Sequence, residues 1–244
     1  MAGRLWKRAR AKGFANPDAY FAAVQSDPGG SLEMDLIDAL TTNHTGFFRE
    51  PAHFDFLRRR ILPSLKDRQS LRIWTAASST GEEPYSIAIT LTEELGETAS
   101  RIASVKASDI STRALERARS AIYPADRFRE QTPEWKRKYL HRGTGPQAGN
   151  FRIRPEIRAM VQFERINLMS ALPADGPFPL IFLRNIMIYF DRPTQQRLVN
   201  ALTEKLDPGG FLFIGHSESL NGIQHSLELV QVAIYRRSGG TTLR

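Results

Sequence analysis

The residues best suited to chemistry in this sequence follow short apolar runs, at the points where strands of a sheet would end. The first group is AASSTGEEPYS (76–86), in which small residues and Gly81 allow the backbone to approach a ligand. The group lacks the GxGxxG pattern, and Glu82 and Glu83 would repel a pyrophosphate, so a dinucleotide fits poorly. A cationic ligand such as a sulfonium fits better. The structural alternative is a strand–helix turn whose glutamates favour the helix dipole.

Two more groups follow the next expected strands. Asp109 closes SVKASD (104–109), and an acidic side chain there can accept hydrogen bonds from both ribose hydroxyls of a nucleoside. Aspartate is also a common helix N-cap, a role for which Ser111 competes. Asn167 and Leu168 follow VQFERIN and could bind and pack an adenine ring, although a structural turn explains this pair more simply.

The fourth group is LRNIMIYFD (183–191). Arg184 and Asn185 interrupt an apolar run, which is costly unless the two side chains are paired or line a cleft. Tyr189 would face the same cleft if the chain turns helical after Asn185. A buried tyrosine with a satisfied hydroxyl is the competing interpretation.

A fifth polar group lies earlier, in TTNHTGFFRE (41–50). A loop that carries Asn43, Thr45 and Arg49 could cover the cleft from the N-terminal side. Its alternative is a plain connector that docks its two phenylalanines into a core.

The elements that must position these groups alternate from Leu71 onward. Apolar runs of strand length alternate with amphipathic stretches, a pattern typical of an α/β fold with a doubly wound, mostly parallel sheet. One such helix is PTQQRLVNALTEKL (193–206), begun by its proline and ended by Asp207-Pro208-Gly209-Gly210. The expected strands span residues 71–77, 104–109, 161–167, 179–185 and 211–217, with one or two more at 227–237.

Pattern and composition also divide the chain into parts. Residues 1–50 show helical spacing of apolar residues and no good strand, which predicts a small N-terminal helical domain with a linker to about residue 70. Residues 71–244 then form the larger α/β domain. Residues 123–160 interrupt its alternation and are rich in Arg, Lys, Pro and Gly. Within them FRIR alternates like a strand after a Gly-rich loop, so we predict an inserted β-subdomain.

The composition excludes several kinds of chemistry. The 244 residues include no cysteine, which excludes disulfides and cysteine nucleophiles, and the five histidines lack the spacing of metal ligands. No apolar run is long enough to cross a bilayer, and the basic first residues lack the apolar core of a secretory signal, so we expect a cytoplasmic protein. The net charge of +8 favours an acidic partner. The basic stretch RLWKRARAK (4–12) could dock on such a partner or be a solvated helix face.

These motifs together resemble a known family, the chemotaxis receptor methyltransferases (CheR), from about Leu36 to about Tyr235. The resemblance implies a fold of the S-adenosylmethionine-dependent methyltransferase type, with a helical N-terminal domain and an inserted antiparallel β-subdomain for receptor docking, which residues 123–160 would supply. HRGTGPQAG resembles the loop of members that bind a receptor's C-terminal peptide. The family's N-terminal domain usually has a further helix or two, so we expect a truncated or short member. The stretches that carry the resemblance, in family order, are TTNHTGFFRE, WTAASSTGEEPYSIA, ASDIS, FLRNIMIYFD and GHSESL.

The resemblance implies an enzyme that transfers a methyl group from S-adenosylmethionine to glutamate carboxylates of chemotaxis receptors, giving methyl esters and S-adenosylhomocysteine. The expected partner is the receptors' cytoplasmic helical domain; a metal, a nucleic acid and membrane insertion are not expected, and the chain should be a monomer. Arg49 and Tyr189 are the residues expected near the transferred methyl group. The residues expected to contact the cofactor are Asn43, Thr45, Arg49, Glu83, Asp109, Asn167, Leu168, Arg184 and Asn185.

Other functions compete with this interpretation. A nucleic-acid methyltransferase would suit the positive charge, but amino-methylating members of that class usually carry an NPPY-like tetrapeptide where this chain has RNIM. The non-enzymatic alternative is a signalling module that binds S-adenosylmethionine without activity, which the filled cleft positions disfavour. A nicotinamide dehydrogenase is disfavoured by the missing glycine pattern and the paired glutamates.

Overall fold

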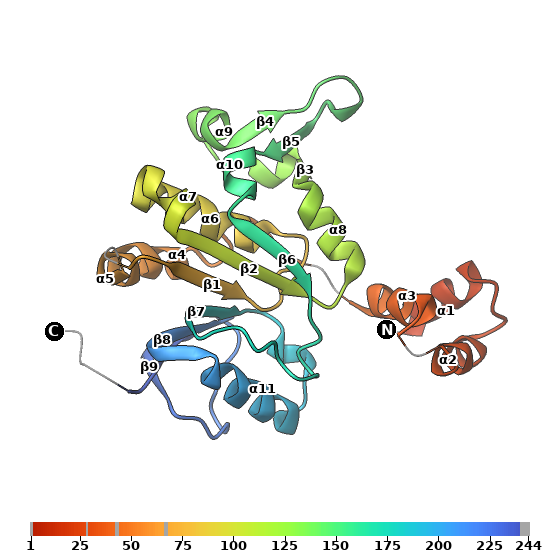
Figure 1. Cartoon of the computed structure of the whole chain (residues 1–244). Coiled ribbons are helices and arrows are strands. Elements are labelled where there is room, and N and C mark those ends of the chain that lie inside the picture. The colour runs from red at the N-terminus through yellow and green to blue at the C-terminus, as the bar shows by residue number, and fades with distance from the viewer. Residues whose placement is uncertain (1, 28, 42–43, 66–67, 240–244) are drawn as a thin grey trace.

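A seven-stranded sheet forms the centre of the computed structural model, which describes residues 2–27, 29–41, 44–65 and 68–239. Its strands are β1 (Leu71–Thr75), β2 (Ala103–Asp109), β6 (Val161–Arg165), β7 (Phe178–Leu183), β8 (Leu206–Ile214), β9 (Leu227–Gln231) and β10 (Ile234–Arg237). Their order is β6-β2-β1-β7-β8-β10-β9 (Figure 1). Within the described residues β10 alone runs opposite to the other six strands, so the predicted doubly wound, mostly parallel sheet is confirmed.

Helices cover both faces of this sheet, and each face has its own apolar core (Figure 1). One face carries α6 and the α4–α5 segment, and the other packs against α11. The central strand β7 reads FPLIFL and is buried along its whole length, as expected for a parallel strand covered on both sides. The helices of this part are α4 (Pro51–Phe56), α5 (Leu62–Leu65), α6 (Glu82–Leu95), α7 (Ala99–Ile102), α8 (Thr112–Ser120) and α11 (Arg192–Glu204), with a π-helical turn at Leu57–Ile61 between α4 and α5.

The end of α11 corrects one sequence-based prediction. We expected Asp207-Pro208-Gly209-Gly210 to form the turn after the helix, but all four residues belong to β8, which already begins at Leu206. The register between β7 and β8 shifts between Phe178 and Leu180, and Gly209 takes a φ of 77°. Turn-forming residues fit inside this strand because an irregular register absorbs the extra backbone.

A second, smaller sheet lies between α8 and β6 in the sequence. Its order is β3-β5-β4, with β3 (Ile122–Pro124), β4 (Leu140–Arg142) and β5 (Asn150–Ile153) all antiparallel. The Gly-rich stretch 143–149 joins β4 to β5 as predicted. The helices α9 (Pro133–Tyr139) and α10 (Pro155–Arg158) flank this sheet, and neither was foreseen. A separate antiparallel sheet is therefore present where the insertion was predicted, while its limits at 123 and 160 stay a prediction.

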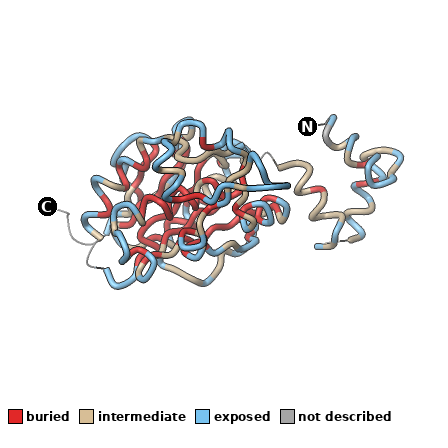
Figure 2. The backbone as a smooth tube through the Cα atoms, turned by 90° about the horizontal axis from the view of Figure 1, so that it is seen from above, coloured by how far each residue is buried: buried red, intermediate tan, exposed pale blue. Residues whose placement is uncertain are grey.

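The N-terminal part of the described residues forms three helices before α4: α1 (Ala2–Ala11), α2 (Pro17–Gln25) and α3 (Ser31–Leu40). Figure 2 shows them as a lobe beside the main body, whose interior holds most of the buried backbone. Their own core is small and centres on Ala9, Tyr20 and Leu36. The lobe meets the main body where α3 contacts α8. Among the described residues, the helices are all too short or too polar to span a membrane.

Candidate active site

A cavity of about 380 Å³ lies at the carboxyl ends of β1, β2, β6 and β7. The strand order reverses between β1 and β7, which is the place where an open α/β sheet binds ligands. Residues that follow the four strands form most of its walls, and α3 and the loop at 44–49 supply the rest. Its apolar lining comes from Ile37, Leu40, Ile110, Ile166, Leu168, Met169, Ile186 and Phe190.

The turn after β1 brings backbone amides toward the end of β2. The Ser79 N–H donates to Asp109 Oδ2 at 2.8 Å. Gly81 has a φ of 95°, and a Cβ atom there would lie 2.8 Å from the Ala118 Cβ and 2.9 Å from the Tyr123 hydroxyl. Only glycine therefore allows the turn to pack this closely against α8 and β3.

Asp109 lines the cavity and does not cap the helix that follows it. Ser111 is the N-cap of α8, because its hydroxyl accepts a hydrogen bond from the Ala114 N–H at 3.0 Å. The Ser111 N–H in turn donates to Asp109 Oδ1 at 2.9 Å. Burial raises the pKa of the Asp109 carboxyl, although these amide hydrogen bonds oppose the shift. Further donors from a bound ligand would therefore stabilise the ionised carboxylate.

Arg184 lies buried between two glutamates that come from distant parts of the chain. Its guanidinium donates to Glu83 Oε2 at 2.8 Å and to Glu50 Oε2 at 3.0 Å, and the side chain is 3% exposed. It also donates to the Arg49 carbonyl. The desolvation cost of burying Arg184 is thus offset by its ion pairs with the two glutamates, in line with the expectation that this arginine is paired. Because two carboxylates surround one guanidinium, the cluster itself carries a net negative charge.

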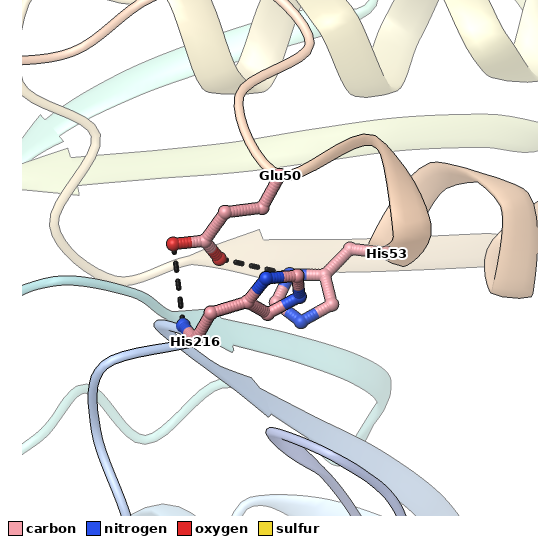
Figure 3. A group of neighbouring side chains, drawn as sticks. All are labelled: Glu50, His53 and His216. Carbon is pink, nitrogen blue, oxygen red and sulfur yellow. Dashed lines mark hydrogen bonds and ion pairs between the residues drawn. The ribbon is translucent and has the colours of Figure 1, made fainter.

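Behind this ion pair, Glu50 lies beside two histidines, His53 and His216 (Figure 3). Burial raises the pKa of Glu50, but the charge of Arg184 and hydrogen bonds from Asn185 and the His216 N–H outweigh it and hold the pKa below its usual value. The ligand atoms of these three residues lie within 4.8 Å of one another. Both Glu50 oxygens, however, already accept hydrogen bonds, including those from the Arg184 guanidinium. A cation here would compete with Arg184, so the group favours an ion-pair network over a metal centre.

A third glutamate, Glu218, fixes the turn that follows β7. Glu218 accepts hydrogen bonds from the backbone N–H groups of Asn185 at 2.9 Å, Met187 at 2.8 Å and Gly215 at 2.7 Å. Asn185 has a φ of 57°, and a side chain at Gly215 would overlap its amide. One short helical turn, Met187–Tyr189, then directs Tyr189 toward the cavity, where it is 55% exposed.

The loop at 44–49 both borders the cavity with polar side chains and docks its two phenylalanines into the core, the two alternatives that the sequence left open. Thr45 and Arg49 line the cavity, while Phe47 and Phe48 pack against the core next to α6. The Phe48 N–H donates to the Ser86 hydroxyl at 2.9 Å. The loop is therefore anchored by its phenylalanines and presents its polar side chains to the cavity.

Comparison with known proteins identifies the family. Residues 43–236 match the family described as CheR methyltransferase, SAM binding domain. The chain belongs to the CheR family. It is 45% identical over 237 residues to the chemotaxis protein methyltransferase of Klebsiella aerogenes, covering 95% of this chain and 79% of that one. It is 41% identical over 240 residues to the chemotaxis protein methyltransferase of Escherichia coli, covering 96% of this chain and 81% of that one.

The chain is thus a methyltransferase of the CheR family with an S-adenosylmethionine-binding domain, as the resemblance implied. Among solved structures, the glycopeptide N-methyltransferase MtfA complexed with sinefungin is similar with a TM-score of 0.43 and 16% identity. That likeness covers 82% of this chain and 62% of MtfA. It is too distant to inform the site.

The cavity brings together nearly all of the residues that the CheR resemblance implied. Asn43 lies outside the described residues. The roles of the implied residues in binding and catalysis stay predictions, because lining the same cavity does not show that a residue contacts a ligand. The implied residues that line the cavity are Thr45, Arg49, Glu83, Asp109, Asn167, Leu168, Arg184, Asn185 and Tyr189.

Sequence reasoning missed the residues that support this set. Glu50 ends the stretch TTNHTGFFRE and Glu218 lies within GHSESL, so both stood in quoted motifs without an assigned role. The only sign of either residue was an acidic side chain inside a recognised motif. Ile37 and Leu40 of α3 were also missed, because a helix of the N-terminal lobe gives no sequence sign that it borders the sheet.

Proposed function

We propose that this chain transfers a methyl group from S-adenosylmethionine to glutamate side chains of chemotaxis receptors, giving glutamyl methyl esters and S-adenosylhomocysteine. The observation that carries the proposal is the cavity at the sheet's switch point, with Asp109 and Glu83 on its walls and Arg49 and Tyr189 beside them. The chain's membership of the CheR family adds the substrate class. The related proteins are named chemotaxis protein methyltransferases.

The cavity suits the proposed cofactor chemically. Apolar walls near Asn167 and Leu168 would hold an adenine ring, and the Asp109 carboxylate would accept hydrogen bonds from the ribose hydroxyls. The Glu50–Arg184–Glu83 cluster has a net negative charge, which favours a sulfonium. When bound, the cofactor supplies an electrophilic methyl group.

The protein's part in the reaction is to position the acceptor. A glutamate carboxylate is already ionised near neutral pH, so its oxygen can attack without a general base. Arg49 and the Tyr189 hydroxyl would orient the carboxylate at the mouth of the cavity, and the surrounding apolar walls would exclude water. Arg49 must hold the carboxylate weakly, because the charge of the attacking oxygen is lost in the transition state.

The proposed partner is the cytoplasmic helical domain of a chemotaxis receptor, and the proposed location is the cytoplasm. The small β3-β5-β4 sheet would hold the receptor, with its edge strand β4 available to a C-terminal receptor peptide. His141 and Arg142 on β4 are exposed, which suits an acidic peptide.

Calorimetric titration with S-adenosylhomocysteine tests the cofactor site. We expect one-to-one binding by the native chain and an affinity at least about 100-fold lower in Asp109→Ala, since two hydrogen bonds to a carboxylate are lost at roughly 1.5–3 kcal/mol each. Asp126→Ala, which removes an exposed aspartate outside the cavity, is the matched control. An Asp109→Ala variant that stays folded and binds with native affinity would contradict the assignment.

Tyr189→Phe tests the acceptor side of the cavity. We expect kcat for methylation of a receptor fragment to fall about 10- to 100-fold, because one hydrogen bond to a charged group is worth roughly 1.5–3 kcal/mol. The affinity for S-adenosylhomocysteine should not change. Tyr139→Phe, which removes a hydroxyl from the small sheet's flanking helix, should leave both quantities as they are. An unchanged kcat in Tyr189→Phe would remove Tyr189 from the mechanism.

A further inference from the structure

We infer that an exposed apolar rim, formed by Met169, Ile188 and Tyr189 at the mouth of the cavity, selects acceptor glutamates that have an apolar neighbour on an acidic helix. The inference rests on the proposed function and deepens it, because it names the sequence context of the methylated glutamate. Ile188 is the specificity residue of this rim. It precedes Tyr189, does not line the cavity and is exposed to solvent, so its side chain can contact the acceptor chain outside the cavity.

The side chains of the rim are exposed although they are large and mostly apolar. Ile188 is 58% exposed, Tyr189 55% and Met169 45%, whereas large apolar side chains are mostly buried in this fold. Met169 and Tyr189 border the same cavity from the ends of two different strands, β6 and β7. Exposed apolar side chains that gather at one functional opening mark a contact surface more than scattered ones do. The other exposed large apolar side chains of the described residues are Trp6 and Phe21 on the N-terminal helices and Leu229, Val230 and Val232 at β9.

The backbone under the rim is held in place before any partner binds. The N–H groups of Met187 and Ile188 both point to Glu218 Oε1, at 2.8 and 3.4 Å. On the opposite side, the Met169 N–H donates to the Asn167 side chain at 2.9 Å. A surface fixed in this way loses little conformational entropy on binding, which favours recognition.

Three exposed arginines lie close to the cavity or close to the rim in sequence. Arg127 donates to the carbonyl of Thr45 at 2.9 Å, and Arg165 donates to the carbonyl of Ile110 at 3.2 Å, so both exposed guanidinium groups lie next to residues that line the cavity. Arg192 follows the rim by three residues and is also exposed. An apolar rim with exposed arginines near the same cavity fits an acidic chain that also presents an apolar side chain.

Helix geometry sets where that apolar side chain must lie. Residues three or four apart on a helix have Cβ atoms about 5–6 Å apart on one face. When a glutamate enters the cavity past Tyr189, the residue one turn away on the same face would lie over Ile188. Small or aliphatic residues suit that position, and charged ones would be desolvated there without a partner.

Methylation kinetics on the purified cytoplasmic fragment of a chemotaxis receptor test the inference. We expect Ile188→Glu to raise KM at least about tenfold, with kcat and the affinity for S-adenosylhomocysteine within a factor of about two of the native values. Ile188→Leu should restore the native KM. Leu229→Glu places the same charge at a similarly exposed residue, 65% exposed on the sheet edge, and should leave KM unchanged.

Synthetic helical peptides extend the test to the acceptor side. Replacing the apolar residue four positions from the glutamate with lysine should raise KM for the native enzyme but have a much smaller effect on Ile188→Glu, where the two facing charges are opposite. Equal effects in both enzymes would show that Ile188 does not contact this position and would overturn the inference. Sedimentation of the native chain as a dimer and of Ile188→Glu as a monomer would show that the rim contacts a second copy of the chain. This result would also overturn the inference.

The two levels of proposal can fail separately. If the native enzyme is active and Ile188→Glu has the same KM, the inference about the rim is wrong but the proposed function is unaffected. A native chain that binds S-adenosylhomocysteine but methylates no receptor fragment overturns the proposed function. In that case fluorescence anisotropy of the labelled receptor fragment tests whether the rim contacts it. Weaker binding of the fragment by Ile188→Glu than by the native chain supports the inference, and equal binding overturns it.

Discussion

Arg184→Ala is expected to lower the free energy of unfolding by roughly 3–5 kcal/mol and to abolish cofactor binding. The side chain is buried and pairs with Glu50 and Glu83, so its removal leaves two carboxylates near one another without their counter-charge. The Arg49 carbonyl also loses its donor, which loosens the loop over the cavity. Urea denaturation measures the first effect and calorimetry with S-adenosylhomocysteine the second.

Arg68→Ala is the matched control for this stability effect. Arg68 pairs with Asp207 at 2.6 Å but is 42% exposed, and such surface pairs contribute about 0–1 kcal/mol. The triple variant Arg184→Met, Glu50→Gln, Glu83→Gln should recover part of the lost stability without recovering binding, since it removes the unpaired charges. A stability loss in Arg184→Ala no larger than in Arg68→Ala would contradict the buried network.

Acid should destabilise the protein through His53. Burial and the nearby Arg184 charge lower the pKa of His53 from 6.5 to about 3, although Glu50 opposes the shift. Below pH 6.5 the unfolded chain takes up a proton on this imidazole while the folded chain does not. The His53 contribution to stability is therefore intact above pH 6.5 and is lost as the pH falls toward 3. The loss should be roughly 2 kcal/mol between pH 6 and pH 4.5.

His53→Phe separates this contribution from that of the carboxylates. Among the described residues neither ring nitrogen of His53 has a hydrogen-bond partner, although Nδ1 lies 3.4 Å from Glu50 Oε2. The ring packs edge-on against Phe213 with ring centroids 5.3 Å apart, so a phenyl ring suits its surroundings. Denaturation at several pH values should show a shallower slope for this variant between pH 6.5 and 4. Substitution of the exposed His141 by Asn serves as the control. Parallel curves for native protein and His53→Phe would show that His53 takes up its proton in the folded state.

The sequence by itself determined the fold class and the strand ends that carry the site. Apolar runs of strand length predicted the sheet, and a parallel sheet brings its carboxyl ends to one edge whatever the details of packing. The order of residues along the chain was therefore enough to assign Asp109, Arg184 and Asn185 to one cleft. The start of β8 could not be predicted, because its turn-forming residues enter the strand only through the irregular register with β7.

Only the tertiary structure decided how the site is held together. Glu50 and Arg184 are 134 residues apart in sequence, and no local pattern indicates that they pair. The same is true of Glu218, which fixes the turn after β7 from the end of β8, and of α3, which closes the cavity from the N-terminal lobe. Hydrophobic periodicity reports on one element at a time. The pairing of buried charges depends on which helices, strands and loops are neighbours in space, and only the tertiary packing determines this.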